Sequence, residues 1–167
     1  MRDLYLVSVW LHIVAVTIWV GGMLFLTLVV VPWLRGPGRA TGIAFLRASG
    51  RRFRAIAWLC FAILLVTGSF NLHMRGVGLA SFADSDWLGS SFGRTVLYKL
   101  GLFAVVLILS ALHDFVMGPR ATAALERDPS SAEALRLRKA ASWFGRLNLL
   151  LGLLLVLFGV MIVRGGL

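Results

Sequence analysis

Four long apolar runs constrain this chain more than any other feature. They cover about residues 4–34, 53–72, 95–117 and 143–163, and glycine, proline or clustered charges bound each of them. A helix needs roughly 20 mostly apolar residues to cross a bilayer, and all four runs reach that length. With 59% hydrophobic and 14% charged residues, the chain is not an ordinary soluble enzyme. We predict an all-α, integral membrane four-helix bundle that forms a single transmembrane domain over residues 1–167.

The basic residues predict how this bundle is oriented. Twelve of the 17 lysines and arginines fall in the loop after the first run or the loop after the third: Arg35, Arg39, Arg47, Arg51, Arg52, Arg54, Arg120, Arg127, Arg136, Arg138, Lys139 and Arg146. Cytoplasmic loops carry such an excess, so we expect both loops inside and both termini outside (N-out/C-out). This placement explains the net charge of +10 without nucleic acid as a partner. Membrane lipids with anionic head groups are expected to bind the basic loops.

The sequence Ser130–Glu133 after the third run has the pattern of a capping box. It predicts a short basic helix that ends at about Ala140, before the fourth span.

Ionisable residues inside apolar runs indicate where the chemistry lies, because each costs several kcal/mol in a bilayer unless it is paired or used. Six candidates lie within the runs or directly at their outer ends: His12, His73, Lys99, His113, Asp114 and Arg164. In the predicted topology His12, His73, Lys99 and Arg164 lie in the outer half of the bundle. Imidazole ligates haem iron and basic side chains pair with the propionates, so this group favours an anionic cofactor, haem b.

For such a site we expect the following residues to bind the cofactor: His12, His73, Lys99, Trp19, Gly21, Gly22, Arg75 and Arg164. The metal ligands would be His12 first, then His73, with His113 as a third candidate. Arg75 and Arg164 would pair with the propionates. Three alternatives stay open: a hydrogen bond from His12 to a neighbouring helix, an interfacial position for His73, and extension of the Lys99 side chain to the head groups. For His113, a pair with Asp114 or a role in a proton relay agrees with the sequence as well as ligation of iron does.

Copper is the alternative metal. Cu(I) prefers thiolate and thioether ligands, and His12, Met23, His73 and Met74 would then pass copper across or into the membrane. Cys60, the single cysteine, is expected to pack in the interior. A third interpretation is a non-catalytic subunit of a membrane complex, whose polar residues only join helices.

Four segments resemble known families. Leu11–Phe25, with its His12 and Trp19, resembles the first helix of the copper-resistance D (CopD) family and of HemJ-type protoporphyrinogen oxidases. Arg51–Gly68 and Phe92–Leu100 are similar to the second and third CopD helices. Phe144–Asn148 is similar to the start of the last HemJ helix, although the acidic residue and proline that follow there are replaced by leucines.

The resemblance implies a location in the bacterial inner (plasma) membrane. From HemJ it implies a b-type haem protein for electron transfer or porphyrinogen-type oxidation, in which His12 and Lys99 are functional. Electrons would pass to or from a redox partner, within a larger respiratory assembly. Because four helices leave little room to enclose a haem, we also expect a homo-oligomer or a partner subunit. From CopD it implies copper uptake or resistance. We therefore expect a haem-binding oxidoreductase, with copper handling as the alternative.

Overall fold

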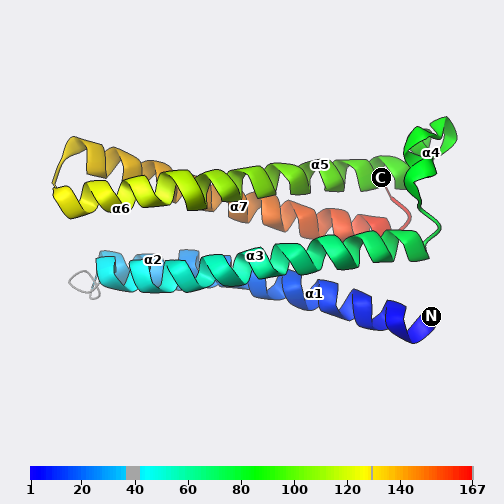
Figure 1. Ribbon diagram of the computed structural model, residues 1–167, viewed down its shortest axis with the longest axis horizontal. Helices are drawn as coiled ribbons and strands as arrows, with labels where there is room; N and C mark the ends of the chain where they lie inside the picture. The colour runs from blue at the N-terminus through cyan, green and yellow to red at the C-terminus, as the bar shows by residue number, and fades with distance from the viewer. Residues whose placement is uncertain (37–41, 129, 167) are drawn as a thin grey trace. The chain divides into compact units, whose positions relative to one another are not determined.

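The computed structural model describes residues 1–36, 42–128 and 130–166, and its regular elements in these ranges are all helical. Four of its helical segments are long and apolar enough to cross a membrane: residues 2–33, 48–74, 91–127 and 132–163 (Figure 1). The predicted class, all-α with four spans, is confirmed. Every helical segment begins before the corresponding predicted run, and the third extends ten residues past its predicted end. Arg39, counted above among the loop cations, lies outside the described residues.

The chain divides into two compact units, residues 1–93 and 94–167. In the first unit, α1 (Arg2–Phe25) continues through the π-helix η1 (Leu26–Val30) into α2 (Val31–Arg35), and α3 (Gly42–Met74) returns alongside α1 (Figure 1). Two short helices follow, η2 (Leu79–Ala83) and α4 (Ser85–Gly89).

The core of the first unit is the interface between α1 and α3. The buried residues of α1 lie along one side of the helix, mostly three, four or seven positions apart, as one helical face requires: Ser8, Ala15, Trp19, Val20 and Met23. Trp19 packs edge-on against Phe61 of α3, with ring centroids 5.0 Å apart. This face positions the polar residues described below.

The second unit has the same plan. α5 (Ser91–Leu112) continues through the π-helix η3 (His113–Met117) into α6 (Gly118–Arg127), and α7 (Ala132–Val163) returns. Ser131 begins α7, because its hydroxyl oxygen accepts a hydrogen bond from the Ala134 amide at 3.2 Å.

The prediction of a separate short helix ending at about Ala140 is wrong, because α7 runs unbroken for 32 residues. The helix is continuous because no proline interrupts this stretch and because most of the first residues of α7 are strong helix formers. At 1.5 Å per residue α7 is about 48 Å long, which exceeds the roughly 30 Å of a hydrocarbon core. Its basic first part therefore extends the span beyond the apolar layer.

Both units contain a π-helix next to a proline. Pro32 follows η1 and Pro119 follows η3, each at the first or second position of the next helix. Proline has no amide hydrogen and its ring clashes with the carbonyl four residues earlier, so a widened turn before it keeps the helix continuous. His12 and Lys99 each lie 20 residues before the proline of their unit. The two units therefore share a backbone plan, whereas the side chains at matching positions, such as His12 and Lys99, differ.

Candidate functional site

His12 is held in a defined orientation by Thr67. Nδ1 of the imidazole lies 2.8 Å from Thr67 Oγ1, and the Thr67 hydroxyl donates its proton to the Ile63 carbonyl at 2.6 Å. Because that proton is already used, Thr67 Oγ1 accepts from His12, so Nδ1 carries the imidazole hydrogen. The neutral ring therefore has its lone pair on Nε2, a nitrogen that can bind a metal ion.

Neighbouring residues of α1 and α3 support this arrangement. Ser8, one turn before His12, donates to the Thr67 carbonyl at 3.5 Å. Gly68 lies against the imidazole, since a Cβ there would be in ordinary van der Waals contact with Cε1 of His12, at 3.4 Å. Thr67 and Ser8 are buried, and His12 is half-buried. The site is thus a polar cluster within an otherwise apolar helix interface.

One turn after Thr67, α3 carries a buried acceptor without a hydrogen-bond partner among the described residues. This acceptor is the Oδ1 atom of Asn71. An unpaired buried polar group costs about 1–3 kcal/mol. A water molecule or a bound cation would satisfy this oxygen.

The predicted pocket-lining residues of α1 lie in different surroundings. Trp19 is 2% exposed and fills the core against Phe61. A Cβ on Gly22 would overlap the ring of Phe53, so Gly22 permits close packing of α3, whereas Gly21 is exposed with no neighbouring atom within 4 Å of an added Cβ. Trp19 and Gly22 therefore belong to the helix interface.

Two sulfur side chains occupy the deeper part of the same interface. Met23 lies on the His12 face of α1, about 16 Å further along the helix at 1.5 Å per residue, and is buried. Cys60 lies two turns before Thr67 on α3 and is also buried. Because of these separations, Met23 cannot share one metal ion with His12.

The predicted outer groups of the first unit lie near the end of α3. His73 is exposed and follows Thr67 by six residues, or about 9 Å of helix rise. Arg75 Nε donates to the Tyr5 hydroxyl at 3.5 Å, and its guanidinium lies 6.0 Å from the Phe92 ring centroid. The assignment of His73 as a metal ligand and of Arg75 as a propionate partner stays a prediction.

In the second unit, Lys99 is half-buried on α5 and lies beside α7 at Gly159, where a Cβ would be 3.4 Å from Nζ. Arg164 is exposed at the end of α7. The cofactor-binding roles predicted for both also stay predictions.

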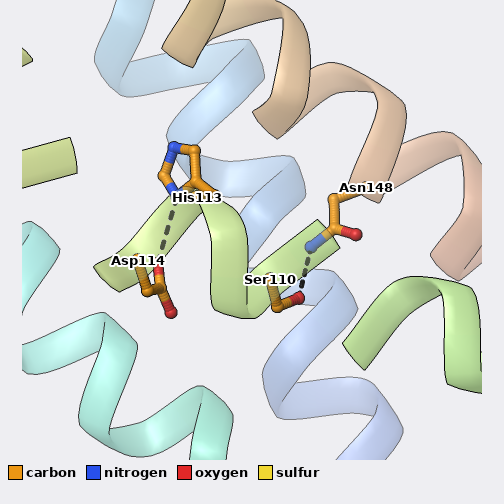
Figure 2. Close-up of polar contacts among 4 residues, drawn as sticks. All are labelled: Ser110, His113, Asp114 and Asn148. Carbon is orange, nitrogen blue, oxygen red and sulfur yellow. Dashed lines mark hydrogen bonds and ion pairs between the residues drawn. The ribbon is translucent and has the colours of Figure 1, made fainter. Parts of the chain in front are cut away.

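A second polar cluster surrounds the start of η3 (Figure 2). His113 Nδ1 lies 3.0 Å from Asp114 Oδ1, and Asn148 of α7 donates through Nδ2 to the buried Ser110 hydroxyl at 2.7 Å. Asn148 Oδ1 is a further buried acceptor without a partner among the described residues. The roles of Thr67 and Ser110 could not be inferred from sequence, because a hydroxyl in an apolar helix commonly bonds only its own backbone.

Neither cluster has the composition of a closed metal cage. Within the described ranges, no three His, Cys, Asp or Glu side chains are grouped closely enough to hold one ion. What each cluster offers is an imidazole oriented through Nδ1, which suits a metal that needs few ligands.

Comparisons with known proteins place the chain in a family. Residues 47–163 match the family described as copper resistance protein D (CopD). An uncharacterized protein of Aquifex aeolicus is 36% identical over 166 residues, which cover 99% of this chain and 97% of the relative. The copper transport protein CutJ of Bacillus subtilis is 30% identical over 103 residues, 62% of this chain but 17% of CutJ. No solved structure matches. With four apolar helices and this match over most of its length, the chain is a multi-pass membrane protein of the CopD family.

Proposed function

We propose that this protein binds copper, as Cu(I), inside the membrane and acts in copper uptake or resistance. The observation that carries the proposal is the match to the copper resistance protein D family over residues 47–163. The similarity to a protein named copper transport protein CutJ supports it. Neither the family description nor the name of that relative refers to haem, so copper, the alternative from sequence, becomes the main proposal.

His12 is the residue that we assign to copper in the first unit. Its Nδ1–H bond to Thr67 fixes the orientation of the ring and makes Nε2 the metal-binding nitrogen, and a second group that fixes a ligand imidazole is the usual arrangement in metal sites. Asn71, one turn after Thr67 on α3, carries a buried Oδ1 without a partner among the described residues. This oxygen is a hard donor, so we assign it to a water near the ion and not to Cu(I) itself.

The other candidate ligands are spread along α1 and α3. His73 and Met74 lie at the end of α3, and Cys60 and Met23 lie two to three turns beyond His12 in the opposite direction. Thioether and thiolate sulfur suit Cu(I). We infer that copper moves between separate sites along this interface, because these side chains are too far apart to bind one ion together.

The test is Cu(I) binding to the detergent-purified protein under anaerobic, reducing conditions against a colorimetric chelator. His12→Ala should remove the tightest site in the first unit. Thr17→Val is the control, because the Thr17 hydroxyl bonds only the Ile13 carbonyl of its own helix, at 2.9 Å. If His12→Ala binds Cu(I) as the wild type does, the assignment of His12 is wrong.

A visible spectrum of the same sample separates copper from the alternatives. A Soret band that His12→Ala removes would support a b-type haem protein for electron transfer or porphyrinogen-type oxidation. A colourless protein that binds no copper would favour the non-catalytic subunit.

A further inference from the structure

The second polar cluster contains an imidazole arranged like that of His12. His113 Nδ1 lies 3.0 Å from Asp114 Oδ1. A carboxylate only accepts hydrogen bonds, so in the tautomer that this contact favours Nδ1 donates and Nε2 carries the lone pair. The His113 side chain is 36% exposed, against 17% for Asp114, so the ring lies partly at the surface of its unit. A carboxylate that orients a histidine is a common feature of metal sites.

The π-helix adds a sulfur ligand at the right spacing. η3 begins at His113 and ends at Met117, and it closes where the Gly118 amide donates to the His113 carbonyl. Met117 therefore lies one widened turn from His113, where side chains of a helix are neighbours. A π-helix of this length is rare and is frequently found at functional sites.

The hydrogen bond between Ser110 and Asn148 supports the cluster from α7. Ser110 is 5% exposed and lies one turn before His113 and Asp114. Its bond to Asn148 joins the last turn of α5 to α7, at the point where the π-helix starts (Figure 2). The ligand residues are thus held by a packed helix pair and not by a loop.

We propose that His113 and Met117 form a second Cu(I) site, in the second unit, with Asp114 as the residue that positions the imidazole. The proposal rests on the copper function proposed above. An imidazole nitrogen and a thioether sulfur are both ligands for Cu(I), which is stable with as few as two ligands. In the predicted topology this site lies toward the cytoplasmic end of its helix, opposite to the end near His12.

The test counts Cu(I) equivalents in the full-length protein, for the wild type and the variants His113→Ala, Met117→Leu, Asp114→Asn and His12→Ala. Met161→Leu, a methionine change on α7, is the matched control for Met117→Leu. We expect His113→Ala and Met117→Leu each to lose one equivalent that His12→Ala keeps. Asp114→Asn should retain it with about 10–100-fold lower affinity, as loss of a supporting carboxylate does elsewhere. X-ray absorption at the copper edge should lose sulfur scattering in Met117→Leu.

The outcomes distinguish this site from the first. If His12→Ala removes all copper while the His113 and Met117 variants bind as the wild type, the second site does not exist and the proposed function stands. If only the His113 and Met117 variants lose copper, the second site stands and the assignment of His12 fails. If the wild type binds no Cu(I), both proposals are overturned. Thermal unfolding of each variant shows whether a loss reflects misfolding.

Discussion

Replacing Thr67 by valine removes one hydroxyl and keeps the shape of the side chain. Thr67 is 6% exposed, and its hydroxyl accepts from His12 at 2.8 Å and donates to the Ile63 carbonyl at 2.6 Å. The Ile63 carbonyl keeps its helical hydrogen bond, so the main loss falls on the His12 Nδ1–H group. An unsatisfied buried donor costs about 1–3 kcal/mol, and because His12 is half-buried we expect the free energy of unfolding to fall by about 1 kcal/mol, the lower end of that range.

The same substitution should weaken copper binding, because the His12 ring is no longer fixed. Loss of a residue that orients a metal ligand typically lowers affinity about 10–100-fold, or about 1.4–2.8 kcal/mol. Unfolding in mixed micelles, followed by tryptophan fluorescence, measures the loss of stability. Chelator competition measures the loss of copper affinity. Thr17→Val, on the exposed face of α1, should change stability by less than about 0.5 kcal/mol. Wild-type affinity in Thr67→Val would refute the argument that this bond orients the ligand.

Three further predictions concern packing and pH. Gly22→Ala should lower stability by about 1–3 kcal/mol, because its Cβ overlaps a phenylalanine ring of α3; thermal unfolding measures this. Ser110→Ala should cost about 1–3 kcal/mol by leaving the Asn148 amide unpaired, and Ser110→Ala with Asn148→Leu should recover most of that loss in a double-mutant cycle. Hydrogen bonds from the Ser130 hydroxyl and amide hold the pKa of Asp128 below its usual 3.8. The ionised carboxylate therefore stabilises this turn above pH 3.8, and the stabilisation is lost as the pH falls through the lowered pKa. NMR titration of the Asp128 carboxyl measures this pKa.

The controls for these predictions come from neighbouring positions. Gly21→Ala meets no atom within 4 Å and should not destabilise the protein, so an equal loss at both glycines would contradict the packing argument. Ser130→Ala should raise the pKa of Asp128 toward 3.8, and an unchanged titration would show that the hydrogen bonds do not form in solution. A double variant at Ser110 and Asn148 that is no more stable than Ser110→Ala would exclude the proposed coupling.

The membrane spans could be predicted because the length of an apolar run is read directly along the chain. The full extent of α7 could not, since its first residues are basic and their helical state depends on propensity and on packing. α6 packs against this part of α7, and Ala121, Ala124 and Ala134 are buried there. The π-helices were also missed, because the sequence marks them only by Pro32 and Pro119.

The candidate site was predicted in part. His12 and His113 could be singled out because an imidazole in an apolar run is costly. Thr67 and Ser110 could not, since a threonine such as Thr17 occupies a similar apolar run and bonds only its own helix. Which hydroxyl bonds a side chain of the neighbouring helix depends on how two helices are aligned, and a single sequence does not specify that alignment. The N-out/C-out orientation stays a prediction.

The repeated plan of the two units has a consequence for how such a protein can be altered. A hairpin of two spans returns the chain to the side of the membrane where it started, so a copy of it keeps its orientation, unlike the inverted repeats of many transporters. Each copy can then change its chemistry without changing its insertion. His12 and Lys99 stand at the same distance before Pro32 and Pro119, so one position holds an imidazole in one hairpin and a lysine amine in the other.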